Sequence, residues 1–170
     1  MKQKASLFLL LTISGLANAE PLCGAVFANP TDNTQVTLTQ QVFDGGLQEL
    51  AIIYQDPNPK QKTTRLSFAG NKEAGCHFPS FALLKGSDWG WHVVWTSSTN
   101  QGVFYARVDG EAWVSSLPKK LSQAVAEQVT LKERQGKLII TAKYPANLNL
   151  PDGNFISDDE GRNWDLAPIK

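Results

Sequence analysis

The feature that most constrains the fold of this chain is a pattern of short apolar runs that recurs three times. The runs lie at 50–54, 91–95 and 137–141, so their last residues are 41 and 46 positions apart. Each run follows a candidate strand and a glycine-containing turn, and each precedes a further strand and turn. Four short antiparallel strands in about 40–50 residues are typical of a β-propeller blade. We therefore predict an all-β fold of about three four-stranded antiparallel blades.

The repeats are expected at about 36–79, 81–117 and 128–168, within one domain that covers residues 20–170. A domain of this size buries a core of its own. The runs are mostly continuous in their apolar character, as expected when neighbouring sheets cover both faces of a sheet. The alternative fold is a β-sandwich whose hairpins resemble one another by chance. The segment 121–128 fits either a short helix or a connection between blades.

The N-terminus has the order of a secretory signal peptide. Lys2 and Lys4 precede an apolar stretch at 7–16, and Ala-Asn-Ala at 17–19 is a small-x-small cleavage site. The apolar stretch is shorter than the roughly 20 residues that a membrane span needs. Cleavage begins the mature chain at Glu20. We therefore expect residues 1–19 to be removed and the mature protein to be soluble, periplasmic or secreted, without a membrane anchor.

The charge balance argues against a nucleic-acid partner. The whole chain has 16 basic and 16 acidic residues, and cleavage removes Lys2 and Lys4. The mature chain then has 14 basic and 16 acidic residues, a net charge of about −2. Proteins that bind phosphate backbones carry a basic excess on their surface. The composition therefore predicts that nucleic acid is not a partner.

Two cysteines, Cys23 and Cys76, remain in the mature chain. In an oxidising compartment such a pair most simply forms a disulfide. The bond would close a loop of more than 50 residues and contribute about 2–4 kcal/mol to stability. The alternative is a metal site that includes His77. His92 is the other of the two histidines, and the ligand spacings typical of zinc sites do not occur. We therefore predict the disulfide, with no metal and no cofactor.

The run at 157–164, SDDEGRNW, resembles the Asp-box, S-x-D-x-G-x-x-W, of sialidase-like (BNR-repeat) β-propellers. Residues 91–97 and 102–107 are also similar to a blade of that family. A degenerate version of the box lies at 108–113, and around 67–76 the box is nearly absent. The resemblance covers about 36–170, and it implies a partial sialidase-type β-propeller.

The chemistry of the box is structural. Side chains such as Ser157 and Asp159 accept hydrogen bonds from turn amides that have no partner in a strand ladder. Gly161 can adopt the positive φ that a tight turn needs. Trp164 packs its large ring against the sheet. As the family uses it, the motif lies away from the catalytic face, so it predicts a fold and not an activity.

The residues that sialidase activity requires are not evident. The resemblance implies three arginines that hold a carboxylate, a Tyr–Glu nucleophile pair and an acidic proton donor. The chain has only Arg65, Arg107, Arg134 and Arg162, and Arg162 lies inside the box. Motifs of other hydrolases and phosphate-binding glycine loops also do not occur. We predict a non-enzymatic protein without catalytic residues, and glycoside hydrolysis is the less favoured alternative.

The strongest candidate binding surface is the tryptophan-rich strand that starts near residue 89. By strand alternation, Trp89 and Trp91 share one face, and His92 lies on the other. Exposed tryptophan rings stack on sugars or anchor protein interfaces, whereas buried ones fill the space between sheets. Tyr105 and Arg107 lie on the next strand and can flank such a site. The candidate ligand-binding residues are therefore Trp89, Trp91, His92, Tyr105 and Arg107, and the core interpretation stays open for the tryptophans.

Three blades are fewer than the roughly four to eight of a closed propeller, so apolar faces at both ends are expected to be uncovered. A homodimer that closes a six-bladed ring is one solution. A second is docking onto another protein, and a third is that the segment 20–35 covers one face. We favour an exported binding or accessory protein that docks to another envelope or extracellular protein. The alternative is a glycan-binding, lectin-like module.

Overall fold

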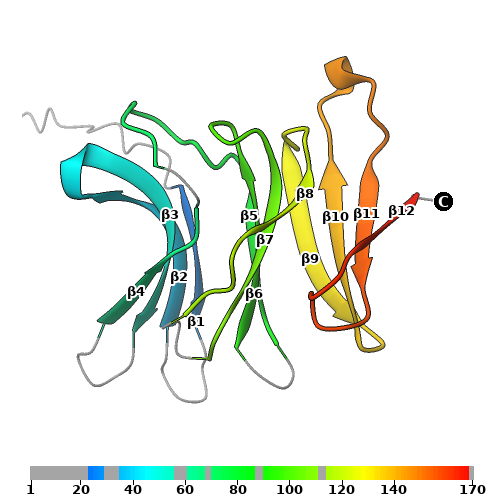
Figure 1. Cartoon of the computed structure of the whole chain (residues 1–170), viewed down its shortest axis with the longest axis horizontal. Coiled ribbons are helices and arrows are strands. Elements are labelled where there is room, and N and C mark those ends of the chain that lie inside the picture. The colour runs from blue at the N-terminus through cyan, green and yellow to red at the C-terminus, as the bar shows by residue number, and fades with distance from the viewer. Residues whose placement is uncertain are drawn as a thin grey trace, which may run out of the picture.

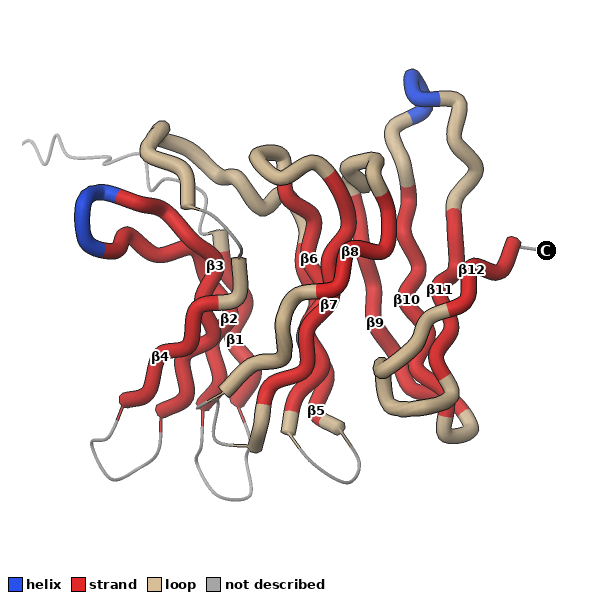
Figure 2. Tube along the Cα trace, in the orientation of Figure 1, coloured by secondary structure: helices blue, strands red, loops and turns tan. Residues whose placement is uncertain are grey.

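The computed structural model describes residues 23–28, 35–55, 61–67, 70–86, 90–110 and 114–168 of the chain. These residues form strands joined by turns and two short 3-10 segments, and they contain no α-helix (Figures 1 and 2). The strands are β1 (Gly24–Ala28), β2 (Gln35–Phe43), β3 (Leu47–Gln55), β4 (Gln61–Arg65), β5 (Phe81–Lys85), β6 (Trp91–Ser97), β7 (Gly102–Val108), β8 (Lys119–Ser122), β9 (Gln128–Arg134), β10 (Lys137–Lys143), β11 (Gly153–Ser157) and β12 (Asp165–Pro168). The 3-10 segments are η1 (Asp44–Gly46) and η2 (Ala146–Leu148).

The strands make three four-stranded antiparallel sheets, and each sheet is a meander of four consecutive strands. Sheet A contains β1 to β4, sheet B contains β5 to β8, and sheet C contains β9 to β12. Figure 1 shows them in an open row with sheet B in the middle. The all-β class and the antiparallel sheets are confirmed. The presence of three sheets distinguishes the fold from a two-sheet sandwich.

The first sheet starts earlier than the sequence pattern indicates. β1 pairs with β2 along its length, with Phe27 opposite Val36. Residues 24–28 therefore extend sheet A at its edge. The alternative that the segment 20–35 covers an open face of a sheet is wrong for these five residues. The apolar run at 50–54 consequently lies in the third strand of its sheet, whereas the other two runs lie in second strands. β8 ends at Ser122, and the residues that follow connect to β9 without a helix.

Sheet B is the centre of the molecule, because both of its faces are covered. All seven residues of β6 are buried. Trp91, Val93 and Trp95 face sheet A, where they pack among residues such as Leu38 and Ile52. The predicted alternation along this strand is confirmed. The cluster between sheets B and C contains Val94, Val103, Tyr105, Ala126, Val129, Ile140, Ala142 and Phe155.

Sheet C ends the row with a polar face. Burial alternates along β10, where Leu138, Ile140 and Ala142 are buried against sheet B. The residues between them point outward with Lys132, Arg134 and other polar side chains of β9. The expectation of an uncovered apolar end face is therefore wrong for sheet C. A sheet with one solvated face alternates apolar and polar residues. β10 follows that rule at Lys137, Thr141 and Lys143, and Ile139 is the exception on its outward face.

The Cys23–Cys76 disulfide is present, as predicted. It joins the start of β1 to the loop between β4 and β5 across 53 positions of sequence. Gln40 holds the same loop, because its side chain donates to the Gly75 carbonyl (2.6 Å) and accepts from the His77 amide (2.9 Å). Within the described ranges, no three His, Cys, Asp or Glu side chains are grouped to hold a metal ion. No helix in those ranges is long and apolar enough to cross a membrane.

Candidate binding site

Trp91, which was predicted to contribute to the binding surface, is not accessible. Trp91 is only 4% exposed and belongs to the core between sheets A and B. Its indole nitrogen donates to the Gly110 carbonyl (3.2 Å), so its one polar atom also has a structural partner. Trp89 lies outside the described residues. We therefore do not include Trp91 in the candidate site.

His92 and Tyr105 lie together between sheets B and C. The Tyr105 hydroxyl oxygen is 2.7 Å from His92 Nδ1, and the two rings are stacked with centroids 6.1 Å apart. His92 is only 4% exposed, and Tyr105 is equally inaccessible. Arg107 is directly opposite His92 in the β6–β7 register. The edge of the Tyr105 ring meets Trp164 of sheet C at 4.7 Å. These residues thus form a polar contact inside the molecule.

Burial controls the charge of this pair. It lowers the pKa of His92 below its ordinary value of 6.5, and the neighbouring Arg107 guanidinium lowers the pKa further, whereas Glu160 opposes the change. Burial also raises the pKa of Tyr105 far above 10.0. Both groups are therefore neutral at pH 7, which suits a buried hydrogen bond.

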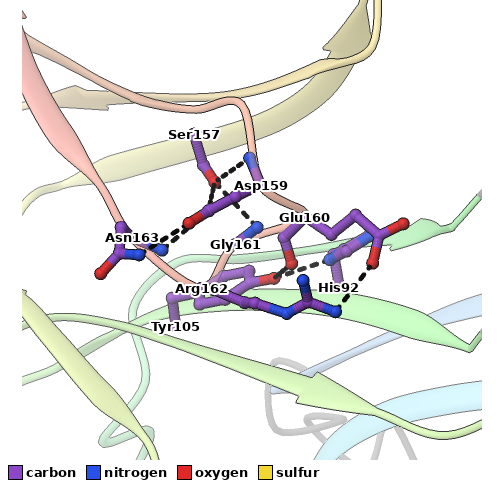
Figure 3. Close-up of polar contacts among 8 residues, drawn as sticks. All are labelled: His92, Tyr105, Ser157, Asp159, Glu160, Gly161, Arg162 and Asn163. Atoms are coloured by element: carbon purple, nitrogen blue, oxygen red, sulfur yellow. Dashed lines mark hydrogen bonds and ion pairs between the residues drawn. The ribbon is translucent and has the colours of Figure 1, made fainter.

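Side chains hydrogen-bond to backbone amides in the turn between β11 and β12 (Figure 3). Ser157 Oγ accepts from the Gly161 amide and donates to Asp159 Oδ1, both at 2.8 Å. The Asp159 carboxylate accepts from the Asn163 amide (2.8 Å) and side chain (2.7 Å). These bonds, led by the Asn163 amide and then by Ser157, lower the pKa of Asp159 to about 2. Trp164 closes the turn by donating to the Gly161 carbonyl (3.2 Å). Asn163 was not predicted, because the motif leaves its position variable.

This turn docks directly onto sheet B. The hydroxyl oxygen of Tyr105 lies 3.5 Å from the backbone oxygen of Glu160. Gly161 has a φ of +79°, and the space where a Cβ would lie is filled by the Tyr105 ring. Ser157 and Asp159 thus fix the conformation of the turn. Gly161 and Trp164 then contact Tyr105, which packs sheet C against sheet B. Their contacts are structural.

A different place, the outer edge of the junction between sheets B and C, forms an open apolar pocket of about 600 Å³. Leu121 and Ser122, the last residues of β8, line it together with Phe155 of β11 and Leu166 of β12. Leu166 is 70% exposed. The lining residues are Leu121, Ser122, Tyr144, Leu150, Pro151, Asp152, Gly153, Phe155, Leu166 and Ala167.

A second hollow of about 530 Å³ continues around the loop that follows β10. It shares Leu150 with the first pocket and is lined by both sheets' connecting segments. Leu148 and Leu150 project from the loop and are 43% and 46% exposed. We call the two hollows together the B–C groove. The second hollow is lined by Pro79, Gln101, Ala124, Val125, Ala126, Glu127, Pro145, Asn147, Leu148 and Leu150.

The polar side chains of Ser122 and Asp152, which line the first pocket, form hydrogen bonds with the nearby backbone. Asp152 Oδ1 accepts from the Tyr144 amide (3.1 Å), which joins the two ends of the loop. Ser122 Oγ accepts from the Ala124 amide (3.1 Å) and donates to the Ala124 carbonyl (3.3 Å). The surface that these bonds leave is mainly apolar, and it suits apolar groups of a ligand or partner.

The sequence gives little indication of this groove. Its walls come from β8, from the loop after β10 and from β12, which lie far apart in the chain. The available signal is the pair of leucines at 148 and 150 in a segment flanked by Pro145 and Pro151. Apolar residues in a proline-bounded loop are candidates for surface contact. Comparison of the chain with family models, with curated proteins and with solved structures gives no match in any of the three.

Proposed function

We propose that this chain is an exported, non-enzymatic binding protein that docks to another envelope or extracellular protein through the B–C groove. The observation that carries the proposal is the exposure of Leu148, Leu150 and Leu166 around one apolar groove. Apolar patches on the surface of a protein that is otherwise polar mark interaction sites. The occupant is a segment of a partner protein that inserts large apolar side chains.

The chemistry of the groove favours a protein over a glycan. Sugar recognition needs polar groups that can reach hydroxyls, usually beside an aromatic ring. In the first pocket, Ser122 and Asp152 already bond to the backbone. Trp91 is in the core, so it offers no stacking platform. The lectin-like alternative is therefore less well supported.

A partial sialidase-type propeller remains our proposal for the fold relationship. Its support is that each sheet is a four-stranded meander, that the first strands β5 and β9 of neighbouring sheets are in contact, and that the 157–164 turn has Asp-box-like hydrogen bonds. Closure of a ring with a second copy is not favoured, because sheet C offers a polar face. Export is supported by the disulfide, and residues 1–19 lie outside the described part.

Site-specific photocrosslinking in cells tests the docking function. We would place a photoreactive phenylalanine analogue at position 166 in the full chain and, as a control, at the exposed Thr130 on the opposite face of sheet C. The expected result is one discrete protein adduct from position 166 that disappears when Leu150→Glu is added. Adducts that are equal from both positions, or insensitive to Leu150→Glu, would contradict the proposal. Turnover of sialosides or aryl glycosides by the purified protein would instead support the enzyme alternative.

A further inference from the structure

The outward face of sheet C concentrates positive charge. Lys132 and Arg134 on β9 and Lys137 and Lys143 on β10 are all exposed on this face. Asp165 on β12 is the acidic residue among the outward positions of the four strands. The face thus carries four basic residues and one acidic residue, a net charge of +3. Because the mature chain totals about −2 (14 − 16), the rest of it carries −5 (10 − 15). This face therefore has a basic excess, whereas the rest of the mature chain has an acidic excess.

The register brings like charges close together. Arg134 is directly opposite Lys137 across the hairpin turn, and Lys132 is the next residue of β9 on the same face. Like charges directly opposite each other destabilise an antiparallel pair. An external anionic surface would relieve this repulsion, so the arrangement favours a negatively charged partner.

The centre of the same face is less polar than its ends. Ile139 and Ile156 are directly opposite each other and half-buried. Beside them, Thr141 Oγ1 donates to Asn154 Oδ1 (2.8 Å). Lys132, Arg134 and Lys137 lie toward one end of the strands and Lys143 lies at the other. A face with shorter side chains in the middle and long cationic ones at its ends suits contact with an anionic surface.

We propose that the outward face of sheet C docks onto anionic lipid headgroups. A membrane fits better than an acidic protein, because protein interfaces are depleted in lysine relative to the rest of the surface, whereas clusters of Lys and Arg are typical of contacts with anionic lipids. Leu166 and the B–C groove lie on the other side of sheet C, where Leu166 is opposite the buried Phe155. The two surfaces can therefore be occupied at the same time, and the lipid contact does not depend on the proposed protein docking.

Vesicle co-sedimentation of the mature chain tests this surface. We expect binding to vesicles of equimolar phosphatidylcholine and phosphatidylglycerol, little binding to phosphatidylcholine alone, and a steep loss of binding as NaCl is raised, because salt screens exposed charges. Lys132→Glu/Lys137→Glu should reduce the bound fraction about tenfold or more, since both reversals act at the contact. The matched control is Lys72→Glu/Lys85→Glu, which changes the net charge equally at exposed positions outside this face and should retain most binding.

Three results would overturn the lipid proposal. The first is an equal loss in both double variants, which would show that only net charge matters. The second is equal binding to both kinds of vesicle. The third is binding to soluble polyglutamate with none to vesicles, which would assign the face to acidic protein segments. Circular dichroism verifies that each variant is folded. Leu166→Glu should leave vesicle binding unchanged, so failure of the groove proposal and failure of the lipid proposal are distinguishable.

Discussion

Gly161, in the turn between β11 and β12, lies against the ring of Tyr105 of sheet B so closely that a Cβ on Gly161 would be 1.9 Å from the Tyr105 hydroxyl oxygen. The glycine is thus required twice, once for its φ of +79° and once for the contact between two sheets.

Gly161→Ala should therefore be strongly destabilising. The added methyl group must displace a buried tyrosine, and its backbone conformation is unfavourable for alanine, so we expect a loss of about 2–4 kcal/mol in the free energy of unfolding. Urea denaturation measures it. Gly136→Ala is the matched control, because Gly136 has a φ of +72° with nothing within 4 Å of the added Cβ. It should cost only about 1–2 kcal/mol. Equal losses in the two variants would show that the contact with Tyr105 is unimportant.

Asp159 should make stability depend on acid pH. Its pKa is lowered to about 2 in the folded protein from an ordinary value of 3.8. The contribution of the ionised Asp159 carboxylate to the free energy of unfolding is therefore complete above about pH 4, and it is lost as the pH falls toward 2. Asp159→Asn should remove this part of the pH dependence in denaturation curves recorded from pH 5 to pH 2.5. The adjacent, exposed Asp158→Asn is the control and should preserve the wild-type slope.

His92 should make stability depend on pH in a higher range. Because its pKa is lower in the folded state than 6.5, the unfolded chain takes up a proton first as the pH falls. The effect of His92 is thus that the free energy of unfolding is highest above pH 6.5 and decreases as the pH falls below that value. His92→Gln, which keeps a hydrogen-bonding side chain near Tyr105, should weaken the decrease between pH 7 and pH 5. NMR titration of the His92 ring provides a direct measurement, and a midpoint above 6.5 would refute the assignment.

The disulfide should stabilise the protein by about 2–4 kcal/mol, because it restricts the unfolded chain across 53 positions. Denaturation with and without reductant measures the difference. Cys23→Ser/Cys76→Ser should match the reduced protein and respond no further to reductant. If reduction leaves the unfolding midpoint unchanged, the bond does not contribute to stability.

The sequence predicted the structure best in segments whose conformation is set by residues close together in the chain. Alternation separated Trp91 from His92 correctly, because β6 is regular and both of its faces are covered. The charged strand β8, Lys-Lys-Leu-Ser, was missed because an exposed edge strand needs no apolar run. β1 was missed for a related reason, since pairing with β2 and not a local motif places it in sheet A.

The candidate sites were less predictable. The turn at 157–164 is local, so its residues could be named from the sequence. Its packing on Tyr105 joins residues more than 50 positions apart, and this contact depends on how sheets B and C meet. The groove depends on how the end of β8 meets β11 and β12 of the next sheet and on the course of the loop that carries Leu148 and Leu150. These are properties of the packed molecule and not of any one segment.

The enclosed position of sheet B has a consequence for the order in which the chain matures. As the chain emerges N-terminus first, sheets A and B can associate and the Cys23–Cys76 bond can form before β9 to β12 appear. Until then, the surface around Val94, Val103 and Tyr105 has no cover. During synthesis the protein therefore exposes an apolar surface of sheet B. We expect chaperones to bind the chain mainly at this stage. This stage ends when residues 128–168 have been made, because sheet C then covers that surface of sheet B.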